Sequence, residues 1–183
     1  VDAGAIVLGE STVTGTYDVT AGGPVTQCTV ATCGSDTTLT ITGATTIDAG
    51  TNAVTLANAS NDFSKTVSGT LGGAVGITGA AVSIRDTNDL VLGTTTTTGS
   101  YTVTAGGGIT DNTPAGSHTE ALTIGTTASF TAGDGEAIIL NNVDASSGPV
   151  HNFSGGALTF AASSGNLAGL TVYAVDAIAL AAL

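Results

Sequence analysis

The chain has 183 residues and a formal net charge of −12, because only two basic residues, Lys65 and Arg85, stand against fourteen acidic ones. So few cations cannot neutralise phosphates, which excludes nucleic acid as a partner and makes an anionic membrane surface repulsive. No run of eighteen apolar residues occurs, so no membrane insertion is expected. A surface rich in Thr and Ser is common in secreted bacterial surface proteins, and we expect an extracellular or cell-surface location.

Residues 1–27 consist of short β-prone runs separated by Gly, such as Thr12–Gly15 and Tyr17–Ala21. Apolar residues recur in these runs at a spacing of two, which is the period of a half-buried strand. Thr and Gly both disfavour helix. The pattern therefore predicts β-strands and no helix.

The segment Cys28–Thr37 interrupts the strand pattern and predicts a loop. Cys28 and Cys33 are the only cysteines, and no His lies close to them in sequence, which leaves too few ligands for zinc. We expect a disulfide between them and hence an oxidising compartment. Two buried, reduced thiols are the alternative.

The sequence then repeats itself. The phrase Val7–Gly9 returns as Val91–Gly93, and Gly15–Gly23 returns as Gly99–Gly107, at the same spacing in both cases. Insertions between the two units fall in turns, chiefly near residues 144–150. We expect one domain over residues 1–183, with a first repeat of about 2–85, a second of about 86–175 and the opening of a third repeat phase at 176–183.

A repeat of many short strands with Asn, Asp and Gly turns predicts stacked coils of roughly 20 residues. We therefore expect an all-β fold, a right-handed parallel β-solenoid (β-helix) of about two 84-residue repeats and roughly nine coils. Apolar side chains would point inward in columns. The intervening Thr and Ser, including the run Thr94–Thr98, would point outward.

Patterns typical of enzymes or metal sites are missing from the sequence. His118 and His151 have no neighbouring Cys or Glu at metal-ligand spacing and are interpreted as exposed loop residues. The turn Asp134–Glu136 lacks the repeated nonapeptide of stacked calcium sites. Asp86 and Asp89 are interpreted as a turn cap and not as paired catalytic carboxylates. We expect no catalytic residue, no cofactor and no metal.

Three phrases resemble the repeats of filamentous-haemagglutinin-like exoproteins: Thr12–Thr26, Leu56–Ser64 and Val82–Gly93. The resemblance covers nearly the whole chain. The resemblance implies a bacterial surface adhesin with a right-handed β-helical shaft, often exported by a dedicated outer-membrane partner. It names no receptor.

The leading functional hypothesis is an extracellular structural protein that forms a surface fibre by end-to-end stacking. Open solenoid ends expose unpaired strand edges, and neither 2–8 nor 172–180 resembles a polar cap. Both ends show one phase of the repeat, so copies could join head to tail. The candidate interface residues are Ala5, Ile6, Leu8, Val175, Ile178 and Leu180.

Two alternatives stay open. The chain could be a fragment of a long adhesin shaft, covalently continuous with further repeats. It could instead be a glycan- or ice-binding solenoid, with host or cell-surface glycans as partners and the run Thr94–Thr98 ordering water or carrying sugar.

Overall fold

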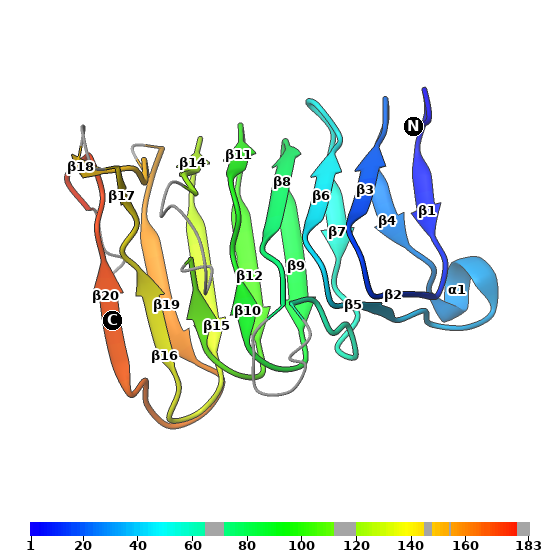
Figure 1. Ribbon diagram of the computed structural model, residues 1–183. Coiled ribbons are helices and arrows are strands. Elements are labelled where there is room, and N and C mark those ends of the chain that lie inside the picture. The colour runs from blue at the N-terminus through cyan, green and yellow to red at the C-terminus, as the bar shows by residue number, and fades with distance from the viewer. Residues whose placement is uncertain (65–71, 112–119, 145–147, 154, 179–183) are drawn as a thin grey trace.

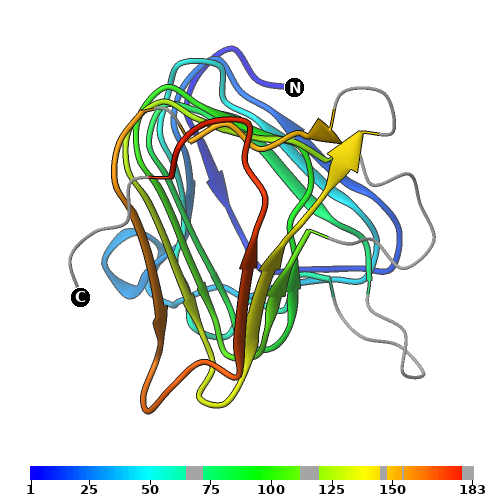
Figure 2. The same ribbon diagram turned by 90° about the vertical axis from the view of Figure 1, so that its left-hand side faces the viewer.

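A computed structural model describes residues 1–64, 72–111, 120–144, 148–153 and 155–178. It confirms an all-β parallel β-solenoid. Successive strands stack side by side along one axis, with the N-terminus at one end and the last described strands at the other (Figure 1). Viewed along that axis, the chain winds around a three-sided outline (Figure 2). We call the sides 1, 2 and 3 in the order in which the chain visits them.

Side 1 is a parallel sheet of seven strands. They are β1 (Ile6–Leu8), β4 (Val25–Gln27), β7 (Val54–Leu56), β9 (Val82–Asp86), β12 (Tyr101–Ala105), β15 (Ala128–Ala132) and β19 (Leu158–Ala162).

Side 2 begins with one strand pair and continues, through residues 61–64, into a four-stranded sheet. Asp62 bridges Thr40 of the pair, and the Thr87 amide donates to the Asn61 carbonyl on the way to the next strand. The strands are β2 (Ser11–Val13), β5 (Leu39–Ile41), β10 (Leu90–Val91), β13 (Ile109–Thr110), β16 (Ala137–Leu140) and β20 (Gly169–Val172).

Side 3 is a five-stranded sheet that is extended toward the C-terminal end by two isolated bridges, Thr123 to Asn152 and His151 to Ala174. Its strands are β3 (Tyr17–Thr20), β6 (Thr45–Asp48), β8 (Val75–Gly79), β11 (Thr95–Thr97) and β14 (Leu122–Ile124). Two elements lie outside the three sides: the helix α1 (Val30–Cys33) and the antiparallel pair β17 (Val143–Asp144) and β18 (Gly148–Pro149).

The core consists of columns of inward side chains, one residue from each turn. On side 1 the pairing aligns Ile6, Val25, Val54, Val82, Tyr101, Ala128 and Leu158, and every member after Ile6 is at most 2% exposed. Phe130 adds an aromatic cluster, since its ring lies 5.8 Å from Tyr101 and 5.5 Å from Phe160. Full burial of one such side chain stabilises the fold by about 1.5–3 kcal/mol.

Turn length varies more than the sequence predicts. On side 1, Ile6 pairs with Val25 and Ala128 pairs with Leu158. The later turn is therefore more than one and a half times as long as the first. The short coil expected from the sequence therefore fits only the shortest turns, because the longer ones carry loops between sides. The nine coils are not confirmed, since the longest sheet has seven strands.

Equivalent phrases of the two repeats do not lie on the same side. Val7 lies in β1 on side 1, but Val91 lies in β10 on side 2; Tyr17 lies in β3 on side 3, but Tyr101 lies in β12 on side 1. From β1 the chain passes β4, β7 and β9, which is three turns, and then advances one side to β10. Each repeat therefore spans three turns and one further side, not the four coils expected from its length.

Two local expectations are wrong. The loop after β4 contains the short helix α1, although no helix was expected. Within the run Thr94–Thr98, Thr95 and Thr97 point inward and are at most 3% exposed, because β11 alternates like every other strand. Their hydroxyl groups donate to the carbonyl groups of Gly93 and Gly99, which satisfies them locally.

Candidate functional site

The two ends of the solenoid are the candidate functional surfaces, because core side chains there lack a covering turn. Each end contributes apolar residues from all three sides that pack against the core yet stay partly exposed. At the first turn these are Ile6, Val13 and Tyr17, and at the last turn they are Phe160, Val172 and Ala174.

At the N-terminal end, β1 pairs with β4 along one edge, and among the described residues its other edge has no strand partner. The structure separates the three residues that the sequence assigned to this interface. Ala5 is exposed and Ile6 is half-buried, whereas Leu8 is only 7% exposed. Ile6 is therefore the apolar contact that this surface offers from side 1.

At the C-terminal end, Leu170 in β20 is 47% exposed, although it continues the column of Leu90, Ile109 and Ile138, which are at most 1% exposed. Leu170 and the neighbouring Tyr173, also 47% exposed, were missed in the sequence. Val175 and Ile178, which the sequence assigned to the interface, are exposed nearby. Leu180 lies outside the described residues.

The loop after β4 is closed by a disulfide between Cys28 and Cys33, whose Cα atoms are 5.5 Å apart. Inside it, α1 forms one helical turn, in which the Cys33 amide donates to the Thr29 carbonyl at 2.9 Å. The carboxylate of Asp36 accepts from the Val30 amide at 3.0 Å. The disulfide closes the loop on itself, and the Cys28 amide and the Thr37 hydroxyl, which both donate to the Leu8 carbonyl, hold the loop against β1.

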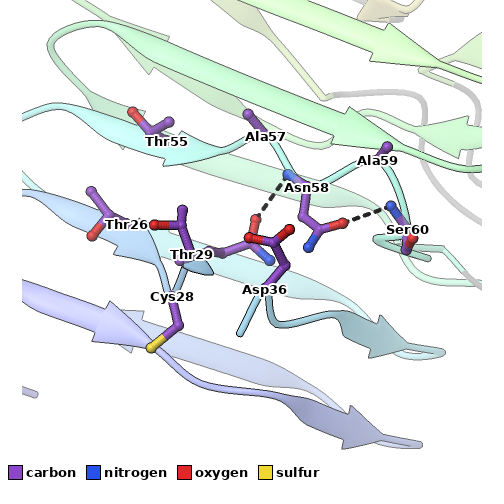
Figure 3. A pocket seen from close by; sticks show the side chains of 10 residues that line it. Thr26, Cys28, Thr29, Asp36, Thr55, Ala57, Asn58, Ala59 and Ser60 are labelled. Atoms are coloured by element: carbon purple, nitrogen blue, oxygen red, sulfur yellow. Dashed lines mark hydrogen bonds between the residues drawn. The ribbon is translucent and has the colours of Figure 1, made fainter. Parts of the chain in front are cut away.

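A groove of about 670 Å³ lies beside this loop (Figure 3). Its lining is rich in hydroxyl, amide and carboxylate groups and contains no aromatic ring. The residues are Thr26, Gln27, Cys28, Thr29, Asp36, Thr55, Ala57, Asn58, Ala59 and Ser60.

Gln27 and Asn58 of the groove lining and the buried Asn61 form what we call the amide cluster. The Gln27 side-chain amide donates to the Asn61 side-chain oxygen at 2.7 Å, and the Asn61 amide donates back to the Gln27 oxygen at 2.9 Å. Asn61 also accepts from the Leu39 backbone amide, and Asn58 donates to the Thr37 carbonyl. The cluster thus anchors the returning end of the loop to the start of β5.

Asp111, Asn142 and His151 form a second, fully buried group, which we call the acid–imidazole cluster. His151 Nε2 lies 2.6 Å from the Asp111 carboxylate, which also accepts from the Asn142 backbone amide at 2.9 Å. The expectation that His151 is an exposed loop residue is therefore wrong, because side 2 supplies a carboxylate partner from a distant part of the sequence. His118 lies outside the described residues.

The two clusters occupy equivalent places in the two repeats. Gln27 and Asn58 precede Asp111 and Asn142 by one sequence repeat, and Asn61 and His151 stand at the same place in the phrases Asn61–Ser64 and His151–Ser154. Leu39 donates its backbone amide to Asn61 just as Leu122 donates to His151. This correspondence is the sequence signal that could have located both clusters.

The ring nitrogens of His151 are both engaged. Nδ1 accepts from the Leu122 backbone amide at 3.1 Å, so the proton of the neutral ring belongs on Nε2, from which it is donated to Asp111. A His–carboxylate pair becomes a proton relay only when a ring nitrogen faces a reacting group. Here the pair links sides 2 and 3 inside the core instead.

Asp86 borders the amide cluster at the start of the turn that leads to β10. Its carboxylate accepts from the backbone amides of Phe63 at 2.6 Å and Asn88 at 3.0 Å, as expected of a turn cap. Burial raises the pKa of Asp86 from 3.8 to about 7, against these two hydrogen bonds, which lower it. The sequence suggested the cap but not the burial.

Among the described residues, no three His, Cys, Asp or Glu side chains are arranged to hold a metal ion. In the same part of the chain, no helix has the length and apolarity needed to cross a bilayer.

Comparison with known proteins gives a family but no function. No curated protein and no solved structure matches the chain. A family model described as repeats of unknown function, DUF5649, matches residues 1–70 and again residues 79–155. The two matches begin at positions 1 and 79, closer together than the repeated phrases, and so do not confirm the 84-residue repeat length. They cover well over half of the chain, which belongs to the DUF5649 family of repeats.

Proposed function

We propose that this solenoid is a structural module of an extracellular bacterial surface fibre, in which copies stack end to end. The observation that carries the proposal is the uncovered core at both ends. Three sides each leave an apolar side chain partly exposed at the first turn, and three sides do so again at the last turn. A second copy would cover both sets at once by a head-to-tail contact.

Leu170 supports this proposal most directly. It occupies a core column, yet the residue is 47% exposed because no described strand lies beyond β20. Large apolar residues clustered at an open strand edge favour association. The disulfide of the loop after β4 supports an oxidising, extracellular location.

The test is sedimentation velocity of the pure chain over a range of concentrations, together with electron microscopy. We expect linear oligomers that lengthen with concentration. Leu170→Asp places a charge in the contact and should leave a monomer. Thr102→Asp is the matched control, because Thr102 is exposed on β12, which lies between β9 and β15 in side 1, away from both ends.

Two results would count against the proposal. One is a monomer at high concentration for the unmodified chain. The other is equal loss of assembly in both variants, since that would show that any added charge disperses the oligomers. Circular dichroism checks that each variant keeps its β-structure.

A continuous adhesin shaft is the second candidate. It is supported by the resemblance to filamentous-haemagglutinin-like exoproteins, with right-handed winding and an 84-residue unit, and by the tail that repeats the opening phase. In such a shaft further repeats would cover Leu170. An open reading frame with many more units would favour the shaft over separate copies.

The groove beside the disulfide loop supports a role for host or cell-surface glycans as additional partners, because its lining contains hydroxyl, amide and carboxylate groups, which bind sugar hydroxyls. Asp36 is the one acidic side chain in its lining. A glycan array with the unmodified chain and Asp36→Ala tests this. Binding that survives the substitution unchanged would place the sugar site elsewhere.

A further inference from the structure

We propose that a second copy stacks on the last turn without rotation, with its β1 on β19. This inference rests on the end-to-end assembly proposed above and specifies its register. The order in which the chain visits the three sides gives the position of the second copy. β19 lies on side 1, β20 on side 2 and Ala174 on side 3, and among the described residues no strand pairs with the outer edge of β19, so β1 of a second copy would continue side 1 there.

The register follows from the columns of side 1. Ile6 and Leu158 belong to one inward column, whereas Val7 and Thr159 belong to the adjacent outward column that runs through Thr26, Thr55, Ser83, Thr102 and Ser129. Stacking in this register would place Ile6 on Leu158 and Leu8 on the partly exposed Phe160. It would bring the outward Val7, which is 51% exposed, beside Thr159.

A competing register follows from the sequence repeat. Where the first repeat meets the second, β11 lies on β8 and β12 lies on β9. Residues Ala157–Phe160 correspond to Ala74–Ile77, so β19 is the counterpart of β8. The same junction at the last turn would put β2 of the second copy on β19, one side away from the unrotated arrangement.

The described tail excludes that competing register between separate copies. That register would put β1 of the second copy next to His151. The reason is that β10, the counterpart of β1, lies next to residues 61–64, which are the counterpart of the segment that begins at His151. Ala174 already bridges His151 there, and the Val175 amide donates to the His151 carbonyl at 2.8 Å. The unrotated register leaves this segment in place. A covalently continuous shaft, in contrast, would follow the repeat register.

Single-cysteine variants in separate chains can distinguish the two registers. Val7→Cys and Thr159→Cys are mixed and treated with a short bis-maleimide, without reductant, so that Cys28 and Cys33 stay joined. Adjacent strands lie about 4.8 Å apart, well within reach. Ser83→Cys combined with Thr102→Cys in one chain is the positive control, since these residues pair on side 1.

A second mixture, Thr12→Cys with Ala161→Cys, tests the competing register. Thr12 corresponds to Thr96, which pairs with Thr78, and Thr78 corresponds to Ala161. We expect a cross-linked dimer with Val7→Cys and Thr159→Cys and at least tenfold less with the second mixture. The reverse ratio, or equal yields, would overturn the unrotated register while end-to-end assembly stands. Monomers in both mixtures, with the positive control cross-linked, would overturn the assembly itself and this inference with it.

Discussion

The amide cluster and the acid–imidazole cluster solve one structural problem with different chemistry. Each pins the chain that returns from a loop to the strand that follows, through a backbone amide of Leu39 or Leu122. The paired amides of Gln27 and Asn61 donate and accept in both directions. In the other cluster Asp111 Oδ1 and Asn142 Oδ1 are buried with no described partner. A duplicated unit can thus keep its geometry while its polar pair becomes ionisable.

The largest expected effect is that of His151→Ala, which would remove the donor that faces the buried Asp111 carboxylate. A buried charge left without its partner costs about 3–5 kcal/mol of folding free energy. Urea denaturation followed by circular dichroism measures it. A loss below about 1 kcal/mol would show that the carboxylate finds another donor and that the cluster does not anchor the fold.

The next effect concerns Asp86, the carboxylate that borders the amide cluster. Its pKa, raised to about 7 in the fold against 3.8, means that the folded state holds the proton more tightly. Its contribution to stability is complete below about pH 4 and is lost as pH rises to about 7, by at most about 4 kcal/mol. Asp86→Asn should therefore flatten the stability profile between these values. Parallel profiles for the two proteins would contradict the raised pKa.

A smaller loss is expected from Asn61→Ala in the amide cluster. The variant would leave the Gln27 amide and the Leu39 backbone amide without their acceptor, but no charge would be stranded. Unpaired neutral groups cost about 1–3 kcal/mol. We expect Asn61→Ala, measured in the same urea series, to lower the free energy of unfolding less than His151→Ala does. The opposite ranking would show that the stranded charge is not the larger cost.

The smallest effect is expected from converting one cluster into the other. Asp111→Gln combined with His151→Asn would restore an amide pair where the equivalent residues of the first repeat already form one. Because the partners change together, we expect a net change within about 1 kcal/mol, less than either single substitution causes. Strictly additive losses would show that the two clusters are not interchangeable.

Much of the fold could be predicted from local pattern. Apolar residues at a spacing of two indicated the strands, Gly-rich corners indicated the turns, and the close spacing of Cys28 and Cys33 indicated the linkage that the structure contains. Gly22 and its equivalent Gly106 show why these corners repeat. A Cβ at either position would lie 2.3 Å from the Ala3 carbonyl oxygen or 2.1 Å from that of Thr87.

The placement of the repeats on the sides could not be predicted in the same way. The spacing of the repeated phrases does not reveal how many sides it spans, because the longest turns exceed the shortest by more than half. The burial of His151 depends on Asp111, which is brought to it by the winding rather than by sequence proximity. Leu170 was missed because its short strand, β20, gives little sign of which residue continues a core column.

End-to-end stacking is tested best by the axial repeat of the assemblies, measured from averaged electron micrographs or fibre diffraction. Seven strands on side 1, at about 4.8 Å each, predict one subunit every ~34 Å along the axis, which is the value for continuous stacking. A strong strand spacing along the same axis should accompany it. A markedly longer repeat, or strands that do not run perpendicular to the fibre axis, would contradict end-to-end stacking.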